Sequence, residues 1–179
     1  GLHAQIGEKS IRIENSGYSL VHPLKGGGGF PTSITYAASN FQDDELFFLD
    51  RIVRPKDSGG LLQFRASECA DATATLLFAS PLRAVVEVRT GYGADQMQML
   101  ESPQAVYRYT YTAFSPVIEV VAEITQNQPL SWREVHFLHL TRKEHTPYTH
   151  VITGAPFKKQ TFNRKGEKSR FIKGAQWAV

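Results

Sequence analysis

The stretches "LRAVVEVRT" (82–90) and "VYRYTYTA" (106–113) decide the fold class of this chain. In the second stretch, Tyr107, Tyr109 and Tyr111 fall on one side of an extended strand, and an arginine and two threonines fall on the other. The first stretch alternates in the same way, with Leu82, Ala84, Val86 and Val88 opposite Arg83, Glu87 and Arg89. A period of two in aliphatic and aromatic residues is typical of half-buried antiparallel strands.

The same alternation extends over much of the chain. Further strands are predicted at 10–14, 32–37, 45–53, 75–78, 117–124 and 132–140. Short runs of turn-forming residues, such as "AFSP" and "TQNQP", separate neighbouring strands. No window predicts an amphipathic helix of roughly ten or more residues. The sequence therefore predicts an all-β fold, an antiparallel β-sandwich.

Composition favours one ordered domain. A length of 179 residues suits a single domain, and a hydrophobic content of 41% allows a buried core. The one cysteine, Cys69, excludes an internal disulfide framework and a multi-cysteine zinc site. No apolar run approaches the roughly 18 residues of a membrane helix. Because "GAQWAV" (174–179) resembles a strand cut short, we expect residues 1–179 to be one sandwich domain that is a fragment of a larger protein.

The segment "HPLKGGGGFPTS" (22–33) contains four consecutive glycines. A Walker-type phosphate loop needs Lys-Ser or Lys-Thr after its last glycine, whereas Lys25 comes before the glycines here. A phosphate site of this kind also needs a following helix, which the pattern does not predict. The glycines are therefore expected to supply positive φ angles or to lie close to a neighbouring segment or a ligand.

The segment "SWREVHFLHL" (131–140) concentrates residues that could carry chemistry. On an ideal strand, Trp132, Glu134 and His136 share one face and Arg133 lies on the other. An aromatic ring can pack on the C–H face of a sugar while a carboxylate and an imidazole exchange hydrogen bonds or protons with its hydroxyl groups. The structural alternative is that Trp132 fills an edge of the sandwich and Glu134 pairs with a basic residue on a neighbouring strand.

Two other features each allow two interpretations. The tyrosine row at 107, 109 and 111 is part of the core, or it is an exposed platform for a glycan or single-stranded nucleic acid; the frequent burial of tyrosine favours the core. Residues 158–173 hold seven basic residues and one acidic residue. They bind a polyanion or protect a sheet edge, and the second interpretation is favoured. A nucleic-acid partner is not favoured, because no recognition motif accompanies the basic stretch.

No cofactor or metal site is predicted from the motifs. The six histidines are scattered, and His136 and His139 fall on opposite faces of a strand. The acidic run "QDDE" (42–45) would suit calcium, but it lacks the spacing of a calcium loop. The chain contains neither a nucleophile-elbow motif nor a zinc-binding H-E-x-x-H motif.

Together, "FASPLRAVVEVRTGY", "YRYTYTAFSPVIEVVAEITQ", "WREVHFLHL" and "GAQWAV" resemble the β-supersandwich domains of the galactose mutarotase-like superfamily. The closest similarity is to bacterial polysaccharide lyases and related glycan-degrading proteins of the exo-rhamnogalacturonan lyase type, over roughly residues 75–179. The resemblance implies a large antiparallel sandwich, a secreted or periplasmic location, and a polysaccharide as substrate or ligand. Complete domains of that type are longer than this chain, so the resemblance also implies that the parent protein supplies the remaining strands or domains.

The resemblance leads to two hypotheses. If the chain is part of a lyase or hydrolase acting on an acidic, pectic polysaccharide, His136 or Tyr109 is the candidate base and Glu134 is a further catalytic candidate. An arginine would neutralise the carboxylate of the uronate. If the chain is a noncatalytic glycan-binding or structural module, it needs no proton-transfer residue. The candidate substrate-binding residues are Trp132, Arg133, Arg108 and Tyr111.

Overall fold

The computed structural model confirms the all-β fold. It describes residues 1–36, 42–43, 47–48, 51–55, 59–92, 103–127, 131–136, 140–141, 151–153, 158–160 and 175–178. Apart from two short 3₁₀ turns, the regular elements among these residues are strands, and their pairings are antiparallel. The chain divides into two compact units, Gly1–Arg142 and Lys143–Val179, and the sandwich lies in the first unit.

The first sheet contains five strands in the order in which they follow one another along the chain. They are β1 (His3–Ile6), β2 (Ser10–Glu14), β3 (Tyr18–Pro23), β4 (Ser33–Tyr36) and β5 (Gln42–Asp43). The strand predicted at 10–14 is β2, and the strand predicted at 32–37 is β4. Strands β1, β3 and β5 were not predicted.

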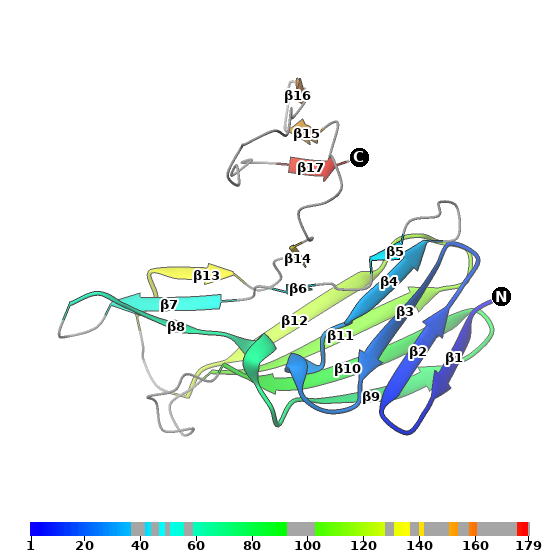
Figure 1. Cartoon of the computed structure of the whole chain (residues 1–179), viewed down its shortest axis with the longest axis horizontal. Helices are drawn as coiled ribbons and strands as arrows, with labels where there is room; N and C mark the ends of the chain where they lie inside the picture. The colour runs from blue at the N-terminus through cyan, green and yellow to red at the C-terminus, as the bar shows by residue number, and fades with distance from the viewer. Residues whose placement is uncertain are drawn as a thin grey trace. The chain divides into compact units, whose positions relative to one another are not determined.

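The second sheet contains four strands in the order β12-β11-β10-β9. They are β9 (Thr73–Ala79), β10 (Arg83–Gly91), β11 (Gln104–Thr112) and β12 (Glu119–Thr125). Figure 1 shows this sheet stacked against the first one, as in a sandwich. Buried side chains from both sheets belong to one hydrophobic core, so the predicted sandwich is confirmed.

Smaller sheets account for the other described strands. In the first unit, β7 (Arg51–Pro55) lies between β13 (Glu134–His136) and β8 (Leu61–Phe64), and β6 (Phe47–Phe48) pairs with β14 (Leu140–Thr141). In the second unit, β15 (Val151–Thr153) lies between β16 (Lys158–Gln160) and β17 (Ala175–Ala178). The strands predicted at 45–53 and 132–140 therefore correspond to two short strands each.

Alternation in β10 and β11 buries one row of side chains from each strand. The register pairs Val86 with Tyr109 and Val88 with Tyr107, and all four side chains are buried. Each large apolar side chain buried in this way contributes roughly 1.5–3 kcal/mol. Leu82 was predicted on the same face, but it is exposed because it lies in the hairpin turn that precedes β10.

One side chain of the first sheet also holds a turn of the second sheet. Asn15, which follows β2, donates from Nδ2 to the carbonyl oxygens of Thr112 and Ser115, at 2.9 and 3.1 Å. Its Oδ1 accepts hydrogen bonds from the backbone N–H groups of Gly17 and Tyr18. A single amide therefore joins the turn between β2 and β3 to the turn between β11 and β12.

The glycine run forms a 3₁₀ turn, η1 (Gly27–Gly29), beside a second turn, η2 (Ala66–Glu68). The φ angle of Gly28 is 66°, and a Cβ atom on this residue would lie 2.6 Å from the carbonyl oxygen of Ala66 and 2.8 Å from Cα of Ser67. Real Cβ atoms do not approach backbone so closely. The prediction of positive φ angles and a close neighbouring segment is therefore confirmed.

Replacing Gly28 should destabilise the fold, because of both its positive φ angle and the backbone that lies close to it. Gly28→Ala is expected to lower the free energy of unfolding by about 3 kcal/mol, because backbone overlap adds to the roughly 1–2 kcal/mol cost of an L-residue at positive φ. Gly59→Ala is the matched control, since Gly59 has a φ of 87° but a Cβ there would meet nothing within 4 Å. Urea unfolding of the two variants measures the difference. Equal losses would contradict the role assigned to the overlap.

Candidate functional site

Charged side chains cross the outer face of the four-stranded sheet from strand to strand. Alternation in β10 buries Val86 and Val88 and directs Glu87 to the opposite face. The register places Glu87 opposite Arg108 of β11. Nε of Arg108 donates to Oε2 of Glu87 at 3.0 Å, and Nη2 of Arg89 lies 2.7 Å from Oε1 of the same carboxylate.

Arg108 extends this row to the next strand. Its Nη1 donates to Oε1 of Glu123 in β12 at 3.3 Å. We call Arg89, Glu87, Arg108 and Glu123 the charge ladder. Because it contains two positive and two negative groups, its chemistry is directed, charge-assisted hydrogen bonding more than long-range attraction.

Glu87 is the fixed point of the charge ladder. Its side chain is 8% exposed, whereas that of Arg108 is 42% exposed. Burial raises the pKa of the Glu87 carboxyl, but hydrogen bonds and charge attraction from Arg108 and Arg89 outweigh burial and hold this pKa below its ordinary value. The carboxylate therefore stays ionised at neutral pH and orients both guanidinium groups, while the side chains of Arg89 and Arg108 are themselves exposed.

An exposed aromatic side chain on β9 lies on the same face as the charge ladder. Phe78 is the register partner of Val85, which alternates with the buried Ala84 and Val86, so Phe78 points outward. Phe78 is 51% exposed. The register shifts beside it, and Leu77 is the additional, exposed residue at this irregularity. The face thus presents an aromatic ring together with fixed donors and acceptors.

The core interpretation of the tyrosine row is confirmed, and the exposed platform is wrong. Tyr107, Tyr109 and Tyr111 are each at most 2% exposed. The hydroxyl of Tyr111 lies 2.5 Å from Nε2 of His22, and that of Tyr107 lies 2.7 Å from the hydroxyl of Tyr92. The roles of Tyr109 as a base and Tyr111 as a sugar contact do not fit this burial, because a polysaccharide cannot reach side chains enclosed between two sheets.

His22 is the buried partner of this row that sequence analysis did not identify. Its Nδ1 lies 2.9 Å from the carbonyl oxygen of Gly29. A carbonyl oxygen only accepts, so Nδ1 carries the proton and Nε2 accepts from the hydroxyl of Tyr111. Burial lowers the pKa of His22 to about 4, although the bond to Gly29 opposes this shift. The alternation of Tyr18, Leu20 and His22 along β3 was the available signal.

Trp132 does not share a face with Glu134, so that part of the prediction is wrong. Trp132 precedes β13, which begins at Glu134, and its indole packs edge-on against Phe64 with ring centroids 5.6 Å apart. The register pairs Phe64 with Ile52 and Glu134 with Val53, the next residue of β7. Successive residues of a strand point to opposite faces, so Glu134 faces away from Phe64.

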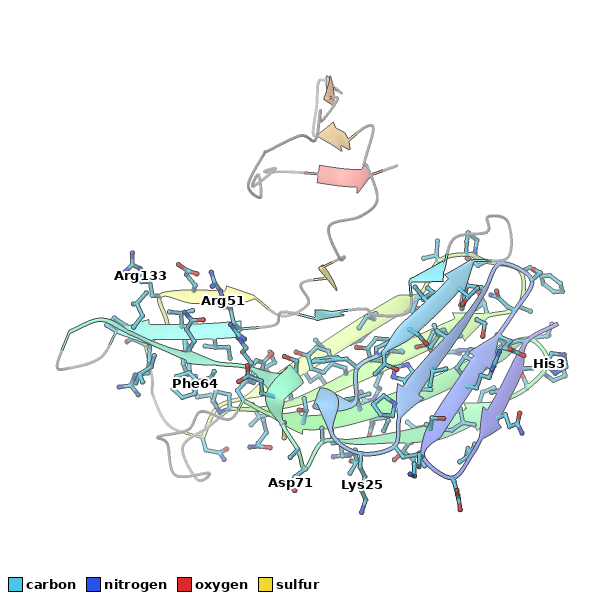
Figure 2. All side chains as sticks on the ribbon, viewed as in Figure 1. His3, Lys25, Arg51, Phe64, Asp71 and Arg133 are labelled. Carbon is cyan, nitrogen blue, oxygen red and sulfur yellow. The ribbon has the colours of Figure 1, made fainter. Side chains whose placement is uncertain are left out.

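The structural alternative is confirmed for both residues. Trp132 packs against the core, and its Nε1 donates to Oε1 of Gln126. Glu134 makes a cross-strand ion pair with Arg51 of β7, whose Nη2 donates to Oε2 at 3.1 Å. Arg133 is exposed and extends away from the sheet (Figure 2). For His136 the structure gives only backbone pairing with Arg51, so the roles of Arg133 and His136 stay predictions.

The charge ladder contains one of the residues that the sequence singled out as functional, Arg108. It was predicted to meet a uronate carboxylate, and its protein partners are two glutamates. Sequence analysis placed Glu87 and Arg89 on the charged face of 82–90 but gave them no role. The signal for the charge ladder is that the outward positions of three consecutive strands carry opposite charges. Only the register shows which of them meet.

The described residues contain neither a cluster of metal-binding side chains nor a membrane-spanning helix. Among them, no three histidine, cysteine, aspartate or glutamate side chains gather where a metal could bind. The side chains of the acidic run 42–45 lie outside the described part, as do His139, His145 and His150, so calcium is not tested. Of the basic stretch 158–173, the structure describes only the backbone of β16. No helix in the described residues is long and apolar enough to span a membrane.

No protein-family model matches the chain, and its sequence matches none of the curated proteins compared with it. The function must therefore be inferred from the chemistry of the surfaces described above. The charge ladder is the strongest of these, because its groups are fixed by one another and both of its arginines remain exposed.

Acidification should destabilise the fold through His22. The pKa of His22 is about 4 in the folded chain, below the ordinary value of roughly 6.5, so folding favours the neutral ring. This stabilisation is fully present above about pH 6.5 and is lost as the pH falls through about 4, up to roughly 3 kcal/mol. His22→Met should remove this pH dependence, and His3→Gln, at an exposed histidine, should retain it. Urea unfolding across this pH range tests the prediction; identical slopes for wild type and His22→Met would contradict it.

Glu87 should matter more for stability than an exposed glutamate in a similar pair. Glu87→Gln is expected to lower the free energy of unfolding by about 2 kcal/mol, because an amide cannot satisfy two guanidinium groups at a nearly buried position. Glu14→Gln is the control: Glu14 pairs with Arg12 at 2.6 Å, but its side chain is 43% exposed. That change should cost less than about 0.5 kcal/mol. Urea unfolding at neutral pH compares the two, and a similar cost at both positions would argue against a fixed charge ladder.

Proposed function

We propose that this chain is a noncatalytic sandwich module that recognises a polysaccharide through the outer face of its four-stranded sheet. The observation that carries the proposal is the charge ladder, in which Glu87 fixes Arg89 and Arg108 on the same exposed face as Phe78. A sugar chain suits this combination, because fixed donors and acceptors can bind its hydroxyl groups while the aromatic ring covers its C–H groups. Groups that are already ordered lose little entropy on binding.

An acidic polysaccharide suits the two arginines best. A guanidinium group has five N–H donors, and Arg108 uses two of them within the charge ladder, one on Nε and one on Nη1. The other donors of Arg89 and Arg108 are available for the carboxylate of a uronate, which arginine binds in a two-point geometry. A secreted or periplasmic location, where such polymers are met, belongs to the same proposal.

Recognition without turnover fits the described residues better than a lyase or hydrolase. A general base must reach the proton that it removes. Tyr109 is enclosed in the core, and Glu134 is occupied by Arg51. Glu87 keeps its negative charge between two arginines and is therefore a poor proton acceptor. His136 stays a candidate base only on sequence grounds.

Replacing the exposed ring of Phe78 is the clearest test of polysaccharide binding by this face. Phe78→Ala should weaken binding of an oligogalacturonate roughly tenfold, or about 1.4 kcal/mol, because the ring no longer covers the sugar. Phe114→Ala is the matched control, since Phe114 is 81% exposed but precedes β12 in the turn after β11. Its removal should leave the affinity unchanged. Isothermal titration calorimetry with the two variants and the wild-type chain measures the effect.

Other outcomes of the same titrations would overturn parts of the proposal. Equal affinity for an oligogalacturonate and a neutral galactan would contradict the preference for an acidic ligand. Absence of binding to both would contradict polysaccharide recognition by this face. The ultraviolet absorbance of unsaturated uronate products, followed in the same samples, would reveal lyase turnover and so contradict a noncatalytic module.

A further inference from the structure

Strand β12 is the terminal strand of the four-stranded sheet. It pairs with β11 along one edge through an uninterrupted register from Glu119 to Thr125, and no strand in the described part of the chain pairs with its other edge. Figure 1 shows β12 alongside β11 at the margin of this sheet. An unpaired strand edge presents backbone N–H and C=O groups that can accept another strand.

The core side of β12 is incompletely covered. The register places Val120 opposite Tyr109 and Ile124 opposite Ala105, and both β11 partners are buried. Val120 and Ile124 are nevertheless only half-buried, and Ala122 between them is exposed. The inner face of the sheet therefore continues beyond the layer that covers β11, and an added strand would extend both the sheet and the core.

The outer side of β12 carries acidic residues. Glu119 and Glu123 are exposed and flank the exposed Val121 on the same face. Natural edge strands are commonly protected by lysine, proline or a bulge. The strand sequence "EVVAEIT" contains neither lysine nor proline, and its register with β11 has no bulge. The edge is thus straight and acidic.

A second copy of β12 fits this edge poorly. In the fully overlapping antiparallel pairing of two β12 strands, Glu123 lies opposite Val121 and diagonal to both Glu119 and Glu123 of the other strand. Diagonal neighbours are within reach of long side chains, so these like charges repel one another. The edge therefore favours a partner strand of opposite charge over self-association.

We infer that β12 binds an extended segment of a partner protein in which aliphatic and basic residues alternate. The backbone of this segment adds to the sheet beside β12, its aliphatic side chains cover Val120, Ala122 and Ile124, and its lysines or arginines face Glu119 and Glu123. The inference shares Glu123 with the charge ladder, but it rests on the unpaired edge and the core side of β12, so it does not depend on polysaccharide recognition.

A lysine–valine peptide tests the inference on the full chain. The probe alternates lysine and valine over the seven residues that β12 contains. At a saturating concentration it should slow hydrogen exchange of β12 amides at least about tenfold. A glutamate–valine peptide of the same length should leave β12 unchanged. The inference is overturned if neither peptide protects β12, if both protect it equally, or if protection lies elsewhere.

Charge variants provide a second measurement. Glu119→Lys should weaken binding of the lysine–valine peptide roughly fivefold at low salt, because an attractive surface pair becomes repulsive. Glu8→Lys is the matched control, since Glu8 is an exposed residue between β1 and β2. An equal loss in both variants would show a nonspecific charge effect and overturn the inference. Concentration-dependent dimers that protect β12 without peptide would instead identify a second copy as the occupant.

Discussion

The stacking of the two sheets depends on the tyrosine row of β11. Its rings meet residues of β3 and of the glycine segment: His22 lies 4.9 Å from Tyr109 and 6.0 Å from Tyr111, and Phe30 lies 5.1 Å from Tyr107, between ring centroids. A shift of β11 by one residue would turn all three tyrosines to solvent and bring an arginine and threonines into the core. The relative position of the sheets is therefore fixed by a small set of aromatic contacts and one buried imidazole.

The same period of two that buries the tyrosines also builds the charge ladder. Arg108 lies between Tyr107 and Tyr109, so its guanidinium reaches the outer face because its neighbours fill the core. Glu87 relates in the same way to Val86 and Val88 in β10. The core therefore positions the outer face, and a change that loosens the packing of β11 would also misplace the donors and acceptors outside.

The difference in polarity between the two faces of a strand decides which strands can be predicted from the sequence. The stretches 82–90 and 106–113 correspond closely to β10 (Arg83–Gly91) and β11 (Gln104–Thr112), because apolar or aromatic residues recur at every second position and most of the intervening residues are charged or hydroxylated. Strand β3 was missed because the inward residue His22 is polar and counts against a buried face. Trp132 was misplaced because the regular alternation of β13 begins only at Glu134.

The candidate site was less predictable, because its pairs depend on register between distant segments. Sequence analysis anticipated that Glu134 could pair with a basic residue on a neighbouring strand, but not that the partner is Arg51, which is 83 positions away. The pairing of His22 with Tyr111 spans 89 positions. Local patterns specify which face a side chain occupies, and only the assembled sheets determine its neighbour.

The side-chain amide of Asn15 has a consequence for biosynthesis. Its acceptors, the carbonyl groups of Thr112 and Ser115, lie 97 and 100 residues further along the chain. At roughly 5–20 residues per second, a ribosome needs about 5–20 s to add that length. Strands β1 to β3 are therefore synthesised well before the strands that cover them. During this time Ile11 and Ile13 lack the neighbours that bury them in the folded protein. This sandwich must close late, once most of its first unit has been translated.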